Sequence, residues 1–485
     1  MDSCVSGFPL RSNPDTPNRA IGAGSGSPEN PGRRDQEALR VDKLFGTDGV
    51  RGVANTELTP LLALKLGTTA AHMLIERKTD AVVLVGRDPR VSGGILESAL
   101  VAGICSQGVD AVLVGVIPTP AVAYLTVETG SAAGAVISAS HNPVKDNGIK
   151  FFGPDGYKLD DAIEAAIEAE IDDFESFPRP SGGAVGRLRR SRELAQKYAA
   201  HVKSTIGCRL DGMKLVLDCA NGAASTPAPQ ILSELGAEAH PINSAPNGVN
   251  INDNCGSLHP KAMRQKTLEV GADAGLSFDG DSDRAILADE RGDIVDGDHV
   301  MAICALHHAS KNDLPGNAIV GTVMSNIGLE IALGKQNVRL IRTPVGDRYV
   351  SEEMRRAGAI IGGEKSGHII FSRHATTGDG IITALQVLQI MRQTGKRLSE
   401  LASVMEEFPQ ILLNVQVKHR NGWDESPEIR AAITEAEQQL LGRGRILVRA
   451  SGTERLIRVM AEGPDLAELE TLTEQVASVV RERLR

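Results

Sequence analysis

The chain has 485 residues, and its 52 Lys and Arg against 62 Asp and Glu give a net charge of −10 at pH 7. This acidic balance argues against general affinity for nucleic acid or for anionic membrane surfaces, and an aromatic content of 3% leaves few rings for stacking on bases. The length exceeds what one compact core supports, so the sequence predicts several domains.

Residues 1–41 differ in composition from the rest of the chain. They are rich in Ser, Pro, Gly, Asn and Arg, and they lack a basic-then-apolar leader. Such a segment buries too little apolar surface to offset chain entropy, so we expect a disordered N-terminal tail. The chain has no run of about 18 apolar residues, and its six cysteines include no C-x-x-C pair. We therefore expect a protein of the reducing cytoplasm with no membrane partner.

A pattern of strand, polar loop, helix and strand then occurs three times. Each copy opens with a short β-branched run, which starts at Ala81, Lys214 or Ala318, and continues into a loop rich in Gly, Asn and Asp or Ser. Alternating strands and helices predict βαβ units in mostly parallel sheets with helices on both faces. The fold class that we expect is therefore α/β, with three similar mixed-sheet α/β domains.

The pattern changes near residue 409. An alternating segment at 411–418, a helical stretch at 427–441, two apolar runs that flank a tight turn and a final helix from Leu466 predict a small α+β domain with one solvated sheet face. The domain boundaries that we expect after the tail are 42–183, 184–298, 299–408 and 409–485.

A serine-rich turn follows the apolar run 134–137. It reads Ser138-Ala139-Ser140-His141-Asn142-Pro143, and Lys150 lies a few residues further on. A strand that ends at such a bend holds a hydroxyl out of the fold, where it can meet a reagent. The competing interpretation is a Ser/Asn/Pro turn with capping hydroxyls.

Three alternating aspartates follow another apolar run. Asp279, Asp281 and Asp283 are each two residues apart, about 6.5 Å in an extended chain, and a loop that curls there can bring three carboxylates onto one hard cation. Oxygen ligands favour Mg²⁺, Ca²⁺ or Mn²⁺ over Zn²⁺. An EF-hand has the same spacing when Glu290 is added, but Arg284 occupies the position where that loop needs glycine. A solvated acidic turn is the other alternative to the Mg²⁺ site that we favour.

Two further segments suit a phosphorylated sugar. In the Gly-rich loop that follows the apolar run 359–361, Glu364 and Ser366 are placed to hydrogen-bond vicinal hydroxyls. The other segment is a turn whose hydroxyls, N–H groups and flanking arginines suit a phosphate: Arg449, Ser451, Gly452, Thr453, Glu454 and Arg458. Taken alone, each segment also fits an ordinary surface turn.

Taken together, these segments resemble the α-D-phosphohexomutase superfamily from about Lys43 onward. The opening segment 44–52 is similar to the branch of that superfamily that acts on glucosamine phosphates. The resemblance implies four domains around one central cleft. Four hallmarks occur in the superfamily's order: a phosphoserine loop (138–143), a metal loop (279–284), a sugar loop (363–368) and a phosphate loop (449–454).

The resemblance also implies roles for single residues. Ser140 would carry a phosphoryl group, and Lys150 would move the proton of the sugar hydroxyl, with His141 as its orienting partner or alternative. The implied catalytic set is Ser140, His141, Lys150 and Arg51. The implied ligands of one Mg²⁺ per subunit are Ser140, Asp279, Asp281 and Asp283. The implied substrate-binding set is Glu364, Ser366, His368, Arg449, Ser451, Gly452, Thr453, Glu454 and Arg458.

The implied activity is an intramolecular phosphotransfer between glucosamine 6-phosphate and glucosamine 1-phosphate. It would pass through a phosphoserine enzyme and a hexosamine or hexose 1,6-bisphosphate, which also serves as activator, and it would feed UDP-N-acetylglucosamine and cell-wall synthesis. We expect a monomer or homodimer, with an activating protein kinase as a candidate partner.

Three residues depart from the superfamily's pattern. Ser282 stands where glycine is commoner but leaves the three aspartates intact, and Arg455 replaces a usual proline. Lys365 replaces the glutamine of the glucosamine branch, which keeps a phosphomannomutase or phosphoglucomutase as the alternative activity. A sugar-phosphate-binding protein without catalysis is the alternative from another class, and the presence of Ser140 with a complete metal loop argues against it.

Overall fold

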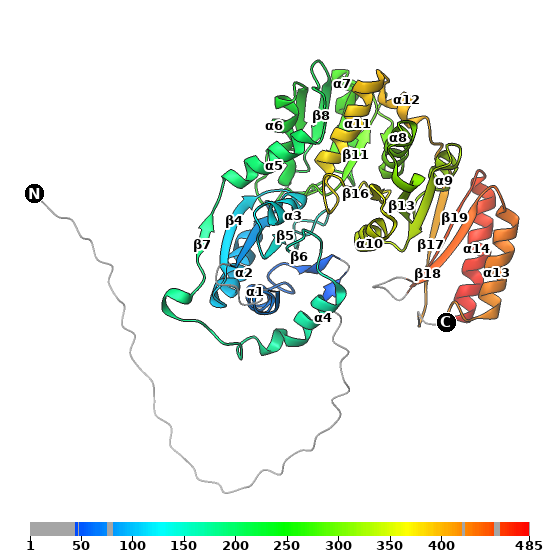
Figure 1. The fold of residues 1–485 in the computed structure, drawn as a ribbon. Helices are drawn as coiled ribbons and strands as arrows, with labels where there is room; N and C mark the ends of the chain where they lie inside the picture. The colour runs from blue at the N-terminus through cyan, green and yellow to red at the C-terminus, as the bar shows by residue number, and fades with distance from the viewer. Residues whose placement is uncertain (1–43, 47, 75–80, 420–421, 451–455, 485) are drawn as a thin grey trace, which may run out of the picture. The chain divides into compact units, whose positions relative to one another are not determined.

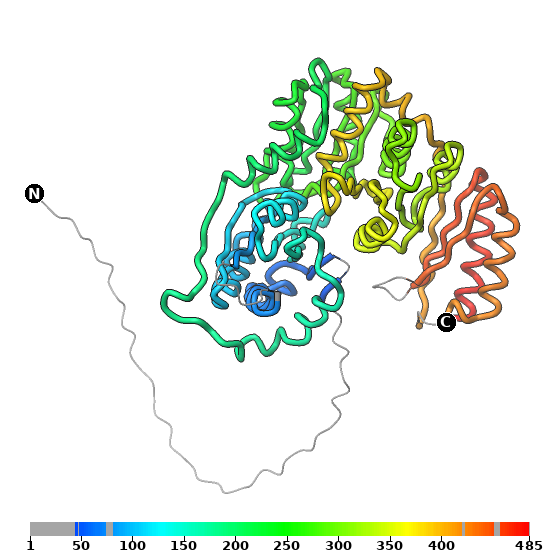
Figure 2. Tube along the Cα trace, in the orientation of Figure 1, coloured from blue at the N-terminus to red at the C-terminus, as the bar shows by residue number. Residues whose placement is uncertain are grey.

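The structure is a computed structural model that describes residues 44–46, 48–74, 81–419, 422–450 and 456–484 (Figure 1). Within these residues the strands form four sheets of seven, five, four and three strands. Each sheet uses strands that are consecutive in the chain, so the colour of the trace changes from one sheet to the next (Figure 2). The tail expected at residues 1–41 lies outside the described residues.

The first sheet has the strand order β1-β2-β6-β5-β3-β4-β7. Its strands are β1 (Phe45–Gly46), β2 (Gly49–Val53), β3 (Val82–Arg87), β4 (Asp110–Val116), β5 (Ala133–Ile137), β6 (Asp146–Phe152) and β7 (Leu188–Arg190). Its helices are α1 (Pro60–Leu74), α2 (Gly93–Ser106), α3 (Thr119–Glu128) and α4 (Asp161–Glu170). β7 pairs with β4 although it follows the boundary expected at residue 183, and the domain boundaries themselves stay a prediction.

The second sheet has the order β12-β11-β10-β8-β9, and the third has the order β14-β13-β15-β16. The second contains β8 (Lys214–Asp218), β9 (Glu238–Ile242), β10 (Ala274–Phe278), β11 (Ala285–Ala288) and β12 (Ile294–Val295), with α5 (Glu193–Ser204), α6 (Pro227–Glu234) and α7 (Lys261–Val270). The third contains β13 (Ala318–Thr322), β14 (Arg339–Thr343), β15 (Ile361–Gly363) and β16 (Ile369–Phe371), with α8 (Gly297–Ser310), α9 (Ile327–Gly334), α10 (Asp347–Ala357), α11 (Gly380–Thr394) and α12 (Leu398–Ala402).

These three sheets share one four-strand unit. Its neighbours are β4-β3-β5-β6, β9-β8-β10-β11 and β14-β13-β15-β16, and in each case three parallel strands are followed by one antiparallel strand. The expectation of three similar mixed-sheet α/β units is therefore confirmed. The unit also fixes where the functional loops lie, because each connection from the third parallel strand to the antiparallel strand leaves the sheet at the same place.

The last sheet is antiparallel, with the order β17-β19-β18. It consists of β17 (Gln410–Gln416), β18 (Arg445–Ala450) and β19 (Leu456–Glu462), and it packs against α13 (Pro427–Leu440) and α14 (Leu466–Arg483). Exposed residues alternate with half-buried or buried ones along much of β17, as a sheet with one solvated face requires. The predicted α+β domain is confirmed.

In the described residues the buried apolar side chains form several clusters, and these clusters do not correspond one to one with the sheets. The largest cluster runs from α3 through the second and third sheets, whereas the last sheet has a cluster of its own. The α/β units thus stabilise one another, because burial of each Leu or Ile contributes about 1.5–3 kcal/mol. None of the helices in the described part of the chain has the length and hydropathy that crossing a membrane would require.

Several helices begin at a side chain that caps them. Asp296 accepts a hydrogen bond from the N–H of His299 at the start of α8, and Asp379 accepts from two N–H groups at the start of α11. Such caps satisfy N–H groups that have no partner within the helix. They fix where α8 and α11 start, and both starts lie beside the loops of the candidate site.

Candidate active site

Three loops in the equivalent position of the common unit form the candidate site. They connect β5 to β6, β10 to β11 and β15 to β16, and they carry Ser140, the three aspartates and Glu364. Ligands of α/β sheets gather at the carboxyl ends of parallel strands. The loops contact one another, because Ser140 hydrogen-bonds Asp279 and the N–H of Ala285 donates to the carbonyl of Gly367 over 3.1 Å. The structure therefore brings together three segments that the sequence could only align in order.

Ser140 is held in place by its backbone and by buried partners. Its φ is +49°, a left-handed conformation that is uncommon outside glycine and costs free energy. Its N–H donates to Ser138 Oγ over 2.9 Å, and its Oγ donates to Asp279 Oδ2 over 2.5 Å. The side chain is not a free turn hydroxyl, since the fold presents it directly to the metal loop.

Arg90 supports the Ser140 loop from behind, a role that was not predicted from the sequence. Its guanidinium donates to the main-chain carbonyl of Ser140 over 3.1 Å and of Asn142 over 2.8 Å. The side chain is fully buried and pairs with Asp88, which also accepts a hydrogen bond from Ser138 Oγ. The available signal was an Asp and an Arg two residues apart in the loop after β3, but their partners are about 50 residues away.

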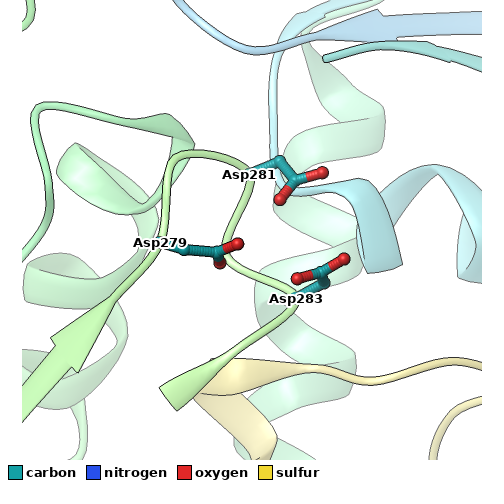
Figure 3. A group of neighbouring side chains, drawn as sticks. All are labelled: Asp279, Asp281 and Asp283. Atoms are coloured by element: carbon teal, nitrogen blue, oxygen red, sulfur yellow. The ribbon is translucent and has the colours of Figure 1, made fainter. Parts of the chain in front are cut away.

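Asp279, Asp281 and Asp283 lie on one turn between β10 and β11 (Figure 3). One oxygen of each lies within 4.8 Å of the others. The Oδ1 atoms of Asp281 and Asp283 are buried without a hydrogen-bond partner, and such atoms are costly unless a ligand engages them. Burial, with Asp283 and Asp281 close by, raises the pKa of Asp279 well above its usual range. The residues present fit a divalent cation that prefers oxygen ligands.

Lys150 joins the metal loop to the opening segment. Its Nζ lies 3.0 Å from Asp281 Oδ2 and 2.9 Å from Asp48 Oδ2, and the side chain is 1% exposed. Burial alone would lower the pKa of Lys150, but Asp281, Asp48 and Asp283 together raise it above its ordinary value. Arg51 also pairs with Asp48. Both basic residues predicted for the site therefore converge on Asp48, which the sequence analysis did not single out.

His141 has a different protonation state from Lys150. Burial and the neighbouring cations Arg284 and Arg51 lower the pKa of His141 to about 4. Its Nδ1 lies 2.8 Å from Arg284 Nη1 and 3.3 Å from Ser140 Oγ. At neutral pH the imidazole is therefore uncharged and close to the hydroxyl that the reaction would use.

The sugar loop places Glu364 and Ser366 side by side. Ser366 Oγ donates to Glu364 Oε2 over 3.2 Å, and the N–H of Gly346 donates to Glu364 Oε1 over 3.1 Å. His368 is 2% exposed, and neither of its ring nitrogens has a hydrogen-bond partner. Lys365 pairs instead with Glu407 over 2.6 Å. Glu364 and Ser366 thus lie next to each other, as predicted from the sequence, and His368 is buried beside them.

The expected phosphate loop is described only at its two edges. Arg449 on β18 lies directly opposite Arg458 on β19 in the antiparallel register, and burial together with the charge of Arg458 lowers the pKa of Arg449. Like charges in opposed positions destabilise a sheet, so a bound anion would stabilise this pair. The remaining residues predicted for this loop, Ser451, Gly452, Thr453 and Glu454, lie outside the described residues.

Family models match nearly the whole of this chain. The models are those of the phosphoglucomutase/phosphomannomutase family, and they match its alpha/beta/alpha domains I, II and III at residues 42–176, 196–292 and 296–408 and its C-terminal domain at residues 412–479. A protein named phosphoglucosamine mutase from Desulforamulus reducens is 55% identical over 439 residues, which are 90% of this chain and 99% of that protein.

Solved structures have the same fold at low sequence identity. A phosphoglucomutase/phosphomannomutase family protein from Burkholderia thailandensis has a TM-score of 0.76 at 22% identity, covering 91% of this chain and 97% of that one. An N-acetylphosphoglucosamine mutase from Aspergillus fumigatus, in complex with GlcNAc-6P and magnesium, has a TM-score of 0.62 at 19% identity, covering 90% and 95%.

Proposed function

Because this chain belongs to the phosphoglucomutase/phosphomannomutase family and is more than half identical to proteins named phosphoglucosamine mutase, we propose that it interconverts glucosamine 6-phosphate and glucosamine 1-phosphate. The observation that carries the proposal is the hydrogen bond from Ser140 Oγ to Asp279 over 2.5 Å. It places a hydroxyl that can carry phosphate against a group of three carboxylates, two of which, Asp281 and Asp283, have a buried oxygen without a hydrogen-bond partner.

In the proposed cycle, Ser140 enters each turnover as a phosphoserine. Its phosphoryl group passes to O1 of glucosamine 6-phosphate, so that the P–O bond to Ser140 breaks and a new P–O bond forms on the sugar. The resulting 1,6-bisphosphate turns end for end. Its 6-phosphoryl group then returns to Ser140, and glucosamine 1-phosphate leaves. Such transfers depend mainly on positioning and on neutralisation of charge.

The proton of the sugar hydroxyl needs an acceptor near Ser140. Lys150 is our first assignment and His141 the alternative. In favour of His141, its imidazole is uncharged at neutral pH, but the same lowered pKa makes it a weak base. Lys150 can accept this proton only after it has given up its own, and the ionised Asp281 and Asp48 beside it keep it protonated. In that state it stabilises negative charge on the transferred group, as Arg51 also would.

Asp279, Asp281, Asp283 and the Ser140 oxygen would hold Mg²⁺. When bound, the cation supplies charge neutralisation for the phosphoryl group. Glu364 and Ser366 would orient the ring hydroxyls, with His368 next to them, and Arg449 and Arg458 would take the phosphate at the far end of the sugar. We place the reaction in the cytoplasm, with a hexosamine or hexose 1,6-bisphosphate or an activating kinase as the source of the first phosphoryl group.

Intact-mass measurement and turnover test the proposal together. The purified full chain, incubated with glucose 1,6-bisphosphate, should gain one phosphate, and Ser140→Ala should lose both that phosphate and the conversion of glucosamine 6-phosphate. Ser138→Ala is the matched control, because it removes the neighbouring hydroxyl and leaves the acceptor, so the protein should still gain the phosphate. Turnover of Ser140→Ala at the rate of the unmodified protein would refute the proposal.

A further inference from the structure

The choice between glucosamine and a neutral hexose needs a residue that recognises the amino group. Lys365 kept the hexose alternatives open in the sequence, but its ammonium group pairs with Glu407 over 2.6 Å and lies 3.8 Å from Asp296. Its charge is already balanced by these two carboxylates, which belong to the start of α8 and to the segment before β17. A cation also repels a protonated amine, so Lys365 does not explain a preference for glucosamine.

Asp347 lies beside the sugar loop. It is the first residue of α10, and the N–H of the preceding residue, Gly346, donates to Glu364 Oε1 over 3.1 Å. From the other side, His368 Nε2 lies 3.7 Å from Asp347 Oδ2, which is too long for a hydrogen bond. The start of α10 therefore lies beside the sugar loop, with Gly346 in contact with Glu364 and Asp347 near His368.

The surroundings hold Asp347 as an oriented anion. Its Oδ2 accepts a hydrogen bond from Lys158, whose ammonium group is shared with Asp48. Its Oδ1 accepts from the N–H of Arg348 in the first turn of α10, where a carboxylate is favoured by the helix dipole. Burial alone would raise the pKa of Asp347, but Lys158 lowers it below its usual value. The carboxylate is thus ionised and fixed before any substrate arrives.

We propose that Asp347 is the residue that recognises the 2-amino group of the substrate, so that it sets the preference for glucosamine phosphate over glucose phosphate. The proposal rests on the proposed function, in which Glu364 and Ser366 hold the adjacent ring hydroxyls. His368, buried and without a hydrogen-bond partner, lies where a group next to Asp347 would also meet its ring.

The charge of the group at C2 determines which sugar phosphate Asp347 would favour. The amino group of glucosamine phosphate is protonated at neutral pH, so that it would form an ion pair with the Asp347 carboxylate in addition to a hydrogen bond. The hydroxyl of glucose at the same carbon can donate only a hydrogen bond without charge. A site whose buried anion faces the C2 substituent therefore discriminates against the neutral sugar.

Equilibrium binding to the full chain, without prior phosphorylation, tests this assignment. Calorimetric Kd values for glucosamine 6-phosphate and glucose 6-phosphate are compared between the unmodified protein and Asp347→Asn. We expect the ratio of the two affinities to fall at least tenfold in the variant, with the Kd for glucose 6-phosphate changing less than threefold. An unchanged ratio would overturn the proposal, even if both affinities fell.

Glu352→Gln is the matched variant, because it removes one negative charge from an exposed position of the same helix and leaves Asp347 and its Lys158 partner in place. Its affinity ratio should stay within threefold of the unmodified protein, and a drop equal to that of Asp347→Asn would overturn the assignment. A second measurement does not depend on how either variant folds. In the unmodified protein the preference for glucosamine 6-phosphate should fall as rising pH deprotonates the sugar amine, and a constant preference would contradict the proposal.

Measurements of turnover distinguish a failure of the role proposed for Asp347 from a failure of the proposed mutase activity. Selective binding of glucosamine 6-phosphate without conversion to the 1-phosphate would refute the mutase activity and leave the role of Asp347 standing. Conversion of both sugars with an affinity ratio that Asp347→Asn does not alter would refute only the role of Asp347.

Discussion

The guanidinium of Arg90 donates a hydrogen bond to the main-chain carbonyl of Ser140 over 3.1 Å, although 50 residues separate them in the chain. The same group also holds the carbonyl of Asn142, so one planar fork supports the bend on which Ser140 lies. Its charge is balanced by Asp88 within a fully buried pair. The proposed phosphate carrier is therefore positioned by the loop after β3, and its left-handed backbone is supported from behind.

Replacing Arg90 by lysine should damage both stability and activity. Lysine keeps the charge but loses the fork, so Asp88 loses its Nε partner, and the carbonyls of Ser140 and Asn142 keep only the hydrogen bonds from Asn252. We expect the free energy of unfolding to fall by about 3 kcal/mol, as for other broken buried pairs, and turnover of glucosamine 6-phosphate to fall more than tenfold. Urea denaturation and steady-state kinetics measure the two effects. Arg209→Lys, in an exposed pair with Asp211, is the control and should change stability by less than about 0.5 kcal/mol.

Removal of divalent metal should stop the reaction and leave the fold intact. The triad contains buried oxygens without hydrogen-bond partners, so chelation exposes a repulsion between carboxylates rather than a loss of packing. We expect turnover to disappear in EDTA and to return with added Mg²⁺, and Asp281→Asn to bind Mg²⁺ at least tenfold more weakly by calorimetry. Glu269→Gln, an exposed acidic residue, is the control for loss of a negative charge. Full turnover in EDTA would contradict a metal role.

The lowered pKa of His141 predicts a pH dependence of stability. Its folded pKa is about 4, whereas a histidine in the unfolded chain titrates near pH 6.5. Between these values the unfolded state binds the extra proton, so the stability that His141 contributes is present above about pH 6.5 and is lost as the pH falls toward 4. In His141→Gln the free energy of unfolding should fall less steeply over this window. Equal slopes in the two proteins would show that the imidazole is not buried in its neutral form.

Replacement of Ser282 by glycine should preserve the fold and raise the free energy of unfolding. Its φ is +62°, the left-handed region in which glycine has no side-chain clash, and its buried Oγ has no hydrogen-bond partner. We expect Ser282→Gly to raise the free energy of unfolding by up to about 1 kcal/mol, with metal-dependent turnover kept. Thermal unfolding measures the change. Ser282→Ala is the matched control, because it removes the same hydroxyl but keeps the backbone strain, and it should not show the gain in full.

Much of the fold could be predicted from local patterns. The strands that start near Ala81, Lys214 and Ala318 and the antiparallel strands of the last domain occur where the sequence placed them, because β-branched runs and polar turns act over a few residues. The shared position of the three site loops could not be predicted. It depends on which strand becomes the third parallel strand of each sheet, and strand pairing is decided by contacts between distant segments.

The sequence by itself determined the reacting groups: a serine at a bend, three alternating carboxylates, a Glu and a Ser in one loop, and paired arginines. The residue types and their spacing are local features, so these groups could be recognised directly in the sequence. Only the tertiary structure decided what surrounds them. Asp48 lies between two lysines, Arg90 lies behind Ser140 and Lys158 pairs with Asp347, and in each case the partners come from distant parts of the chain. The physical reason is burial, because a charged side chain removed from water must find its partner wherever the folded chain provides one.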